Sequence, residues 1–531
     1  MAITKATQDV IEGITATGST TARTLANRFA DVVNVKDFGA VGDGSPSDQS
    51  SIQSALSYAI SNNKIIGFDF NATIRIPTDA PTISDAINHV EILNKNVEIT
   101  INIETGYVIT NQVLLNNINA GQFKITSTDI EVQISRQDLT IAVDGIYYPA
   151  FYATGSLGVL PKINALFNMD STGVAAGRNG IFVNNGAYVY VAPSCGVKNA
   201  GGRGLHVANY STAIARQSNF SGAGEAAVRC AAAYCEVRQS NLSNSSKGLM
   251  LASSALIDAD ASNISGCVIG VESFNAIVRL SSSNISGCTN AILSYDNSIL
   301  SADFSNIDNA TNNAVSITRG SRIDLRSSSI LNAGGIAISA TNCSNVSAAN
   351  VNASNAGTYA IYANGSIIDA NNANLTNSGI YGVFAESGSF INVNIADATG
   401  SGTHGYFNNF GSFINATNAI GSRGRTQNVV TRHGIIFSDG SVPWSFGPSE
   451  ITPETNNTHD IGSLLLMLRR LYVREIRTGV SGDIRILSAS GSPEGIISAP
   501  VGSIYLREDG GAGTTLYVKE SGTGNTGWSS K

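Results

Sequence analysis

Ser262-Asn-Ile-Ser-Gly-Cys267 returns unchanged as Ser283-Asn-Ile-Ser-Gly-Cys288, and this repeat decides the fold. Looser copies give a series of anchor positions that lie 21 to 23 residues apart: 219, 241, 263, 284, 306, 329, 352, 374 and 397. A repeat of that length is too short for a pair of helices. It suits one coil of two or three short strands joined by turns of Gly, Ser and Asn.

Apolar or small residues recur four and six positions before each anchor, in phase with the repeat. Alternation with period two indicates a strand with one face buried. We therefore predict an all-β chain with a parallel β-helix, a single-stranded solenoid of about eleven coils, in which the anchor asparagines stack as a ladder. The predicted inward pairs are Cys235/Val237, Ile257/Ala259, Val278/Leu280, Leu300/Ala302, Ile323/Leu325, Val346/Ala348, Ile368/Ala370 and Ile391/Val393.

The composition agrees with such a solenoid and excludes several other classes. The chain has 531 residues, of which 54 are glycine and 11 are proline, with 42% hydrophobic and 13% charged residues. Disordered chains are less hydrophobic and more charged, and helical bundles hold more charge and more helix-forming residues. The net charge of −7 is mild and argues against a nucleic-acid partner.

Neither a secretory leader, a membrane insertion nor a metal site is expected. The first residues show no basic start followed by an apolar core, and no apolar run is long enough to cross a bilayer. The six cysteines are scattered and form no Cys-x-x-Cys pair, so we expect buried thiols of a reducing cytoplasm rather than zinc ligands. No cofactor is predicted.

The segment from Val33 to Leu56 precedes the repeats. Its glycines at 39, 42 and 44 suit a compact turn with positive φ. Asp48 is the predicted N-cap of a helix that closes the open end of the coil stack, because a solenoid needs a cap over its exposed edge. The apolar face of this helix consists of Ile52, Ala55, Leu56 and Ala59.

Three parts of the sequence resemble known families. Asp37-Phe-Gly-Ala-Val-Gly-Asp-Gly44, followed by Asp48 and Ile52-Gln53, resembles the motif that opens the right-handed β-helices of the pectate-lyase-like superfamily. The stretch 18–35 is similar to the short N-terminal segment that precedes this motif in bacteriophage tailspikes and tail fibres. Thr458-His-Asp-Ile-Gly-Ser463 and Gly502-Ser-Ile-Tyr-Leu-Arg507 are similar to modules of phage tail proteins.

This resemblance implies an elongated homotrimer of right-handed β-helices. It divides the chain into a virion-anchoring segment (1–32), a cap with irregular early coils or an inserted β-rich subdomain (33–150), the regular β-helix (151–420) and a small β-rich trimerisation or tip domain (421–531). The implied partners are further copies of the chain, the virion tail, baseplate or an adaptor protein bound through 1–32, and a host surface polysaccharide. The implied location is the virion tail, after synthesis in the host cytoplasm.

Three functions fit the resemblance. A receptor-binding tailspike or tail fibre attaches the virion to host surface polysaccharide. A depolymerase tailspike also cleaves the polysaccharide, as a hydrolase or lyase, and a structural connector joins virion proteins without enzymatic activity. His404-Gly and His433-Gly are similar to an element of polygalacturonases, but the Asn-Thr-Asp and Asp-Asp motifs of that family are missing, so no complete catalytic motif is recognised.

Charged residues gather on one predicted outer face of the coils anchored between 219 and 329. Glu236, Asp258 and Asp260 are the candidate catalytic residues, because paired carboxylates about 5–9.5 Å apart hydrolyse glycosidic bonds and crowding raises the pKa of one of them. A plain salt-bridge ladder with the interleaved arginines is the preferred alternative. Ligand-binding candidates on the same face are Arg238, Arg279, Asp303, Asp324 and Arg326.

Aromatic residues recur at one equivalent stretch of the late coils. They are predicted to point inward as core or, alternatively, to form a ligand-binding platform, since ring faces pack on C–H-rich sugar faces. These residues are Tyr359, Tyr362, Tyr381, Tyr406 and Phe407.

Overall fold

The computed structural model of the chain describes residues 32–42, 48–173, 175–408, 412–416, 418–421, 444–446, 451–453, 475–478 and 484–531. The predicted virion anchor lies outside the described residues except for Val32. Most of the region 421–483 also lies outside them, including His433 and the segment 458–463. The chain divides into two compact units, Met1–Glu454 and Thr455–Lys531.

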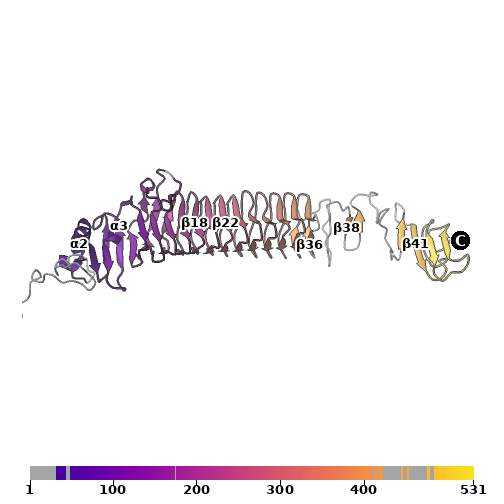
Figure 1. Ribbon diagram of the computed structural model, residues 1–531. Helices are drawn as coiled ribbons and strands as arrows, with labels where there is room; N and C mark the ends of the chain where they lie inside the picture. Colours follow the sequence, from indigo (N-terminus) through magenta and orange to yellow (C-terminus); the bar gives the residue numbers. More distant parts are fainter. Residues whose placement is uncertain are drawn as a thin grey trace, which may run out of the picture. The chain divides into compact units, whose positions relative to one another are not determined.

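The first unit is a parallel β-solenoid of about 15 turns, in which strands of one turn pair with the equivalent strands of the next (Figure 1). The predicted all-β fold with a parallel β-helix is confirmed. The largest sheet, here called the long sheet, has 13 strands. In chain order they are β7 (Val113–Asn116), β10 (Phe151–Thr154), β13 (Ile181–Asn184), β16 (Arg203–Ala208), β18 (Ala226–Ala231), β20 (Lys247–Ala252), β22 (Ile269–Phe274), β24 (Asn290–Tyr295), β26 (Val315–Ile317), β28 (Ile338–Thr341), β30 (Tyr359–Asn364), β32 (Tyr381–Glu386) and β35 (His404–Asn408).

A second sheet, here called the narrow sheet, has 11 strands of three residues each. Single-residue bridges between the anchors, from Asn219 to Asp397, close the remaining side of each regular turn. The narrow sheet consists of β14 (Tyr188–Tyr190), β17 (Thr212–Ile214), β19 (Tyr234–Glu236), β21 (Leu256–Asp258), β23 (Ile277–Arg279), β25 (Ile299–Ser301), β27 (Arg322–Asp324), β29 (Asn345–Ser347), β31 (Ile367–Asp369), β33 (Phe390–Asn392) and β36 (Phe413–Asn415).

The solenoid has more turns than the eleven coils that the sequence predicts, because its early turns lack the regular repeat. Two parallel four-stranded sheets belong to these turns. One contains β3 (Ala72–Ile76), β5 (Ile99–Ile103), β8 (Phe123–Ser127) and β11 (Lys162–Asn164). The other contains β6 (Val108–Ile109), β9 (Val132–Ile134), β12 (Leu166–Met169) and β15 (Gly196–Lys198). The connections between the strands of these early turns differ in length, as between β9 and β10, so the turns show no constant repeat in the sequence.

The helix α2 (Gln49–Ser61) buries its predicted apolar face. Asp48 occupies the N-cap position, but its side chain makes no capping hydrogen bond. Its carboxylate instead accepts the N–H groups of Val41 (2.7 Å) and Gly42 (2.9 Å) and so holds the glycine turn. This helix contacts the 3-10 turn η1 (Val35–Phe38) and the strands β1 (Val32–Asn34) and β2 (Ile65–Phe68). Strand β2 also pairs with β4 (Val90–Ile92), and the short helix α3 (Ile83–Asn88) contacts β7.

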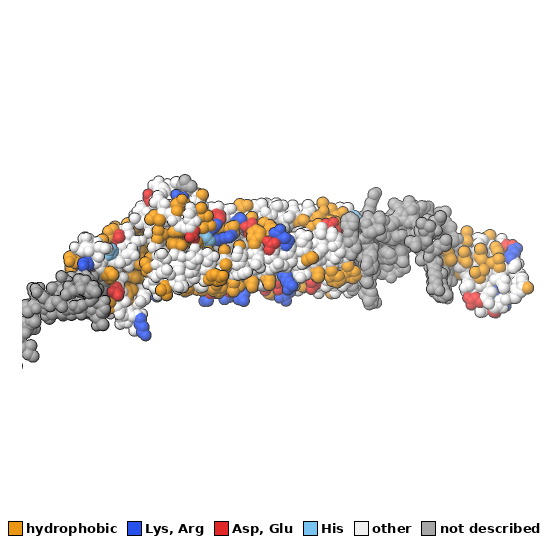
Figure 2. All heavy atoms as spheres, in the orientation of Figure 1, with side chains coloured by type: hydrophobic (Ala, Val, Ile, Leu, Met, Phe, Trp, Pro, Cys, Tyr) orange, Lys and Arg blue, Asp and Glu red, His pale blue; other side chains and the backbone are white. Residues whose placement is uncertain are grey.

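The bore of the solenoid is filled as predicted. Every member of the eight inward pairs is buried, and cysteines 230, 235, 267 and 288 are buried free thiols. Cys195 is half-buried and Cys343 is exposed, so the prediction of buried thiols is wrong for Cys343. Among the anchor asparagines, Asn263 and Asn284 donate to the side chain of the preceding anchor at 3.4 and 3.2 Å. On the visible outer surface, charged side chains are sparse and gather mainly over the middle turns (Figure 2).

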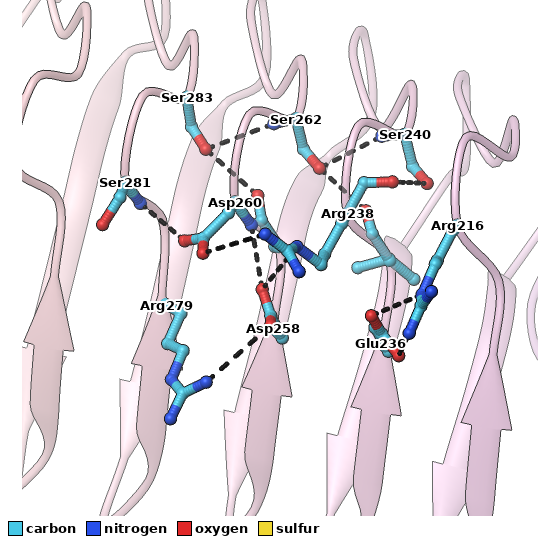
Figure 3. Close-up of polar contacts among 12 residues, drawn as sticks. Arg216, Glu236, Arg238, Ser240, Asp258, Asp260, Ser262, Arg279, Ser281 and Ser283 are labelled. Atoms are coloured by element: carbon cyan, nitrogen blue, oxygen red, sulfur yellow. Dashed lines mark hydrogen bonds and ion pairs between the residues drawn. The ribbon is translucent and has the colours of Figure 1, made fainter.

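A ladder of buried serines joins the regular turns at the corner before the first six anchors, whereas Val351, Ala373 and Ala396 precede the last three. Ser262 Oγ accepts the N–H of Ser240 on the preceding turn (3.1 Å) and donates to the carbonyl of Val237 (2.8 Å). Ser283 Oγ accepts the N–H of Ser262 in the same way (3.3 Å; Figure 3). At this corner, the Ser262 hydroxyl therefore satisfies two buried backbone groups, the Ser240 N–H and the Val237 carbonyl. The corner serines are Ser218, Ser240, Ser262, Ser283, Ser305 and Ser328.

The second unit contains a five-stranded sheet, which confirms the small C-terminal β-rich domain. Its buried residues include Tyr505, Tyr517 and Trp528. No helix in the described part of the chain is long and apolar enough to cross a membrane. The sheet consists of β40 (Glu475–Thr478), β41 (Ile484–Ala489), β42 (Ile504–Arg507), β43 (Leu516–Lys519) and β44 (Trp528–Ser530). The two-stranded pairs β34 (Asp397–Ala398) with β37 (Ile420–Gly421) and β38 (Trp444–Phe446) with β39 (Ile451–Pro453) belong to the first unit.

Replacing Ser262 by Ala should destabilise the solenoid. The change leaves the Ser240 N–H and the Val237 carbonyl buried without this partner, and we expect the free energy of unfolding to fall by about 2–4 kcal/mol. Chemical denaturation followed by circular dichroism measures the difference. Ser282→Ala is the matched control, because Ser282 lies exposed in the same corner region, and it should change stability little. Equal effects of the two substitutions would contradict the role given to the serine ladder.

Candidate functional site

Six charged residues lie together on the outside of the narrow sheet. Glu236, Asp258 and Arg279 end successive strands and pair in register. We call the full set the ion-pair ladder: Arg216, Glu236, Arg238, Asp258, Asp260 and Arg279 (Figure 3). The sequence therefore places the candidate catalytic carboxylates correctly next to one another on adjacent turns.

Glu236 is held by an arginine that the sequence analysis missed. Arg216 Nε and Nη2 donate to the two carboxylate oxygens of Glu236 at 2.5 and 2.9 Å. Although Glu236 lies on the outer side of the strand, only 5% of its surface is exposed. Arg216 follows β17 at the position equivalent to Arg238 after β19, so the repeat phase already contained the signal for it.

The two aspartates share two more arginines. Asp258 lies 3.6 Å from Arg238 Nε and 3.9 Å from Arg279 Nη1, and Asp260 lies 4.0 Å from Arg238 Nη2. Asp260 also accepts the N–H of Ser281 at 2.9 Å. The ion pairs of the salt-bridge alternative are thus present, while the catalytic roles of Glu236, Asp258 and Asp260 stay a prediction.

The electrostatic setting differs along this face. Burial, followed by repulsion from Asp258, raises the pKa of the Asp260 carboxyl despite the nearby arginines. Burial acts in the same direction on Asp303, but hydrogen bonds from the hydroxyls of Ser281 (2.5 Å) and Ser301 (2.8 Å) outweigh it and lower the pKa of Asp303. A carboxyl with a raised pKa is the type that serves as a general acid, so Asp260 fits that role better than Asp303 does.

The remaining charged candidates form a separate pair. Arg326 donates to both carboxylate oxygens of Asp324, with Nη2 to Oδ2 at 2.6 Å and Nε to Oδ1 at 2.9 Å. The Arg326 side chain is largely exposed. Exposed pairs of this kind contribute little to stability, so Asp324 and Arg326 remain accessible to a ligand.

A second candidate site is an aromatic cluster on the outside of the long sheet. Tyr359 stacks on Tyr381 with ring centroids 5.4 Å apart, and Tyr381 stacks on Phe407 at 5.0 Å. Phe384 lies across the two tyrosines at interplanar angles of 68° and 62°. Tyr362 pairs with Phe384 in register and completes the cluster. All five rings are half-buried on the outer face, so these residues do not point inward as core, while their role as a ligand-binding platform stays a prediction.

Tyr406 is an exception, and its prediction as a ligand-binding residue is wrong. It pairs in register with the inward residue Val383, and only 7% of its surface is exposed. Its hydroxyl donates to the carbonyls of Ala396 (3.0 Å) and Ile420 (2.9 Å), and burial raises its pKa strongly. The neighbouring residue Phe407 points outward instead, because adjacent residues of a strand face opposite sides. Phe384, which the sequence analysis did not select, belongs to the cluster.

Polar groups border the aromatic cluster. The hydroxyl of Tyr362 donates to Glu386, and Asn364 Nδ2 donates to the same carboxylate at 2.8 Å. His404 lies beside Tyr381 and Phe407, and its Nδ1 is buried without a hydrogen-bond partner among the described residues. Burial lowers the pKa of His404, so the ring is neutral at pH 7. Aromatic surface next to a carboxylate, an amide and an imidazole can bind a polyhydroxylated ligand.

The described residues contain no group of three or more His, Cys, Asp or Glu side chains that could hold a metal ion.

Comparisons with known proteins extend the description of the fold. No protein-family model matches the sequence, and no curated protein matches it. Similar solved structures include a mutant of the periplasmic alginate epimerase AlgG, with 8% identity, a TM-score of 0.37 and coverage of 71% of this chain and 89% of that one. The pre-mature gene product 12 of bacteriophage phi29 has 15% identity and a TM-score of 0.34, and the match covers 76% of this chain and 58% of that chain.

A third similar structure is the Dettilon tailspike protein, with 10% identity, a TM-score of 0.25 and coverage of 75% of this chain and 69% of that one. The solved structures that resemble this chain thus include phage tailspike proteins and alginate epimerases. At these identities the likeness concerns the fold alone.

Asp260→Asn should affect stability in a pH-dependent way. A raised pKa means that the charged carboxyl is less favourable in the folded than in the unfolded chain, so the wild type loses stability as pH rises through its ordinary pKa to the raised one. The Asn oxygen still accepts the Ser281 N–H. We expect the variant to gain stability relative to the wild type between about pH 3 and pH 7, as measured by urea unfolding.

Asp303→Asn is the matched control for this measurement. Because the pKa of Asp303 is lowered, its charged form stabilises the fold above the ordinary carboxyl pKa, and this contribution is lost as pH falls. The Asp303 variant should therefore lose stability relative to the wild type over the same pH range. If the stability difference from the wild type changes with pH in the same direction for both variants, the opposite pKa shifts of Asp260 and Asp303 are refuted.

Proposed function

We propose that this chain is a trimeric tailspike or tail fibre of a bacteriophage, which attaches the virion to a host surface polysaccharide. The observation that carries the proposal is the aromatic cluster on the long sheet, with its polar border of Asn364, Glu386 and His404. The resemblance of residues 18–35 and of the Asp37–Gly44 motif to tailspikes supports the virion context. In this proposal, residues 1–32 bind the virion tail or an adaptor protein.

The aromatic cluster fits a saccharide because it combines two kinds of contact. Its rings are half-buried and lie at several angles to one another, so each leaves part of its apolar surface exposed. The C–H groups of a sugar pack on such rings, and its hydroxyls find acceptors and donors in Glu386 and Asn364. The β-ladder repeats these groups on three successive turns, β30, β32 and β35, which suits an extended chain molecule rather than a compact ligand.

The homotrimer has its support on the narrow sheet. The first residue of each strand there points outward, and in many turns it is a large apolar residue that solvent reaches. The row has two parts, because Arg322 and Asn345 occupy this position on the two turns between Ile299 and Ile367. Exposed apolar surface of this kind marks interaction sites. We propose that the row faces another copy of the chain. Its exposed members are Ile277, Ile299, Ile367 and Phe390.

Depolymerase activity is the second candidate function, and the raised pKa of Asp260 beside Asp258 favours it. Incubation of the protein with a bound polysaccharide, followed by measurement of new reducing ends and new double bonds, separates binding from cleavage. If cleavage occurs at the ion-pair ladder, Asp258→Asn and Glu236→Gln abolish it. Retained cleavage in both variants removes the ladder as the active site.

Tyr381→Ala should weaken polysaccharide binding. Tyr381 is the central ring of the stack, and its loss removes contacts worth roughly 1–1.5 kcal/mol, or about ten-fold in affinity. An array of purified bacterial surface polysaccharides, probed with the full chain, identifies a bound polysaccharide and measures the change. Tyr210→Ala, which removes a fully exposed tyrosine outside the cluster, should leave binding intact. Unchanged binding by the Tyr381 variant would eliminate the cluster as the binding site.

Ile299→Asp should weaken the trimer. Ile299 is the last residue of the first apolar part of the row, next to Arg322. A carboxylate there places charge in a surface that becomes buried on association, while the solenoid core is untouched. Light scattering after size-exclusion chromatography should give the mass of three 55.1 kDa chains for the wild type and a lower mass for the variant. Val268→Asp, at an exposed apolar residue outside the narrow sheet, should stay trimeric. A trimeric Ile299 variant would exclude this face as the subunit contact.

A further inference from the structure

A second hydrophobic cluster lies outside the solenoid bore, on the outer face of the long sheet. Tyr152, Phe182 and Ala208 on successive turns form its buried part, and Val143 and Tyr147 from the preceding connection pack against them. The connection between β9 and β10 therefore covers the outer face of the long sheet at β10, β13 and β16. The next strand along the solenoid is β18. This arrangement builds a wall next to the charged residues of the following turns.

His206 belongs to this wall. Its ring stacks on Phe182 with centroids 4.1 Å apart and an interplanar angle of 7°, and it meets Tyr147 edge-on at 5.2 Å. Burial, together with the positive charges of Arg203 and Arg229, lowers the pKa of His206 well below its usual value. The imidazole is therefore neutral at pH 7 and provides a flat apolar side to its neighbours.

Arg203 is a buried cation with its charge satisfied. Its Nη2 donates to Glu225 Oε1 at 2.6 Å, its Nη1 lies 3.2 Å from His206 Nδ1, and its guanidinium lies 4.7 Å from the centroid of the Tyr147 ring. Only 7% of the residue is exposed. Arg203 thus fixes the positions of Tyr147 and His206 and neutralises the charge of Glu225.

Arg229 lies on β18 without a carboxylate partner, and Arg178 and Arg203 nearby likewise leave Nε buried without a hydrogen-bond partner among the described residues. Arg229 pairs in register with His206 on the preceding turn, and it is half-buried. Among the described residues it forms no ion pair, and its Nε is buried without a hydrogen-bond partner. The nearby acids are already engaged, Glu225 with Arg203 and Glu272 with Lys247 at 2.5 Å.

Burying a guanidinium without an acid partner costs free energy of folding, unless a bound ligand supplies the missing negative charge. Burial lowers the pKa of Arg229, and the charge of Arg203 adds to the effect. A half-buried guanidinium without an acid attracts an anion, and its planar fork fits the two oxygens of a carboxylate or a phosphate. The neighbouring aromatic wall adds apolar contact for the rest of such a ligand.

We propose that Arg229, beside the wall of Tyr147, Phe182 and His206, binds an anionic group of the polysaccharide. The inference rests on the proposed function and narrows its ligand to an acidic glycan, with a uronic-acid carboxylate or a phosphate as the group recognised. Arg229 and the aromatic cluster share the outer face of the long sheet, with β18 and β30 six turns apart, or roughly 29 Å at ~4.8 Å per turn. Between them lies the stacked pair Phe274 and Tyr295, with centroids 4.7 Å apart.

The test uses the full chain and an array with three classes of bacterial surface polysaccharide. These are glycans with uronic acids, each next to its carboxyl-reduced form, glycans with phosphate groups, and neutral glycans. We expect the wild type to bind one anionic class at least ten-fold more tightly than the neutral or reduced forms. Arg229→Gln should remove this preference, and Arg229→Lys should keep part of it because the charge remains.

Lys162→Gln is the control, since it removes the same charge from another sheet, where Lys124 also neutralises Glu98. Thermal unfolding verifies that each variant is folded. An unchanged preference in Arg229→Gln overturns the inference, and so does wild-type binding to neutral glycans alone, which leaves the proposed function standing. Binding to no glycan of any class overturns the inference and the proposed function together.

Discussion

The serine hydroxyls at the corners of the solenoid are the contacts on which its regularity depends. Where a strand ends, the backbone bends, and its N–H and carbonyl groups are buried with no strand partner. A corner serine hydroxyl accepts a hydrogen bond from such an N–H and donates one to such a carbonyl. Ser262 does so with the Ser240 N–H and the Val237 carbonyl. A second corner repeats the arrangement, with the Ser366 hydroxyl accepting the Ser344 N–H at 3.1 Å. Each hydroxyl fixes the register of two turns.

Register in turn decides which side chains line up outside. Because each turn repeats the one before it, residues at one position form columns along the sheets. The narrow sheet thus acquires an apolar column beside the ion-pair ladder, and the long sheet acquires the aromatic cluster and the isolated Arg229. The low charge of the chain has the same origin, because serine, asparagine and glycine occupy the corners and turns.

The sequence was sufficient to predict the solenoid and the residues in its bore, because the alternation at pairs such as Ile257/Ala259 is local and periodic. It was less informative about the early turns, whose connections vary in length. It pointed to the anchor asparagines as the ladder, whereas the serine before six of the nine anchors forms the more regular contacts. Both residue types recur in phase, and only the direction of the side chain at the corner distinguishes their roles.

The candidate sites were predicted in part for the same reason. The carboxylates of Glu236 and Asp258 followed from the repeat. The phase also places Arg216 on their face, but its bond to Glu236 on the next turn depends on the conformation of a long side chain. Tyr406 and Phe407 are neighbours, and a shift of one residue in strand phase exchanges core and surface. Arg229 could not be predicted from the sequence. It matters because the nearby acids pair with other residues, and those pairs involve side chains from several turns.

The central claim is that a polysaccharide lies along the outer face of the long sheet. A structure of the full chain with an oligosaccharide that it binds tests this claim most directly. In this complex we expect sugar rings against Tyr359, Tyr381 and Phe407, with any acidic group at Arg229. Sugar bound instead at the ion-pair ladder of the narrow sheet, with the aromatic cluster empty, would contradict it.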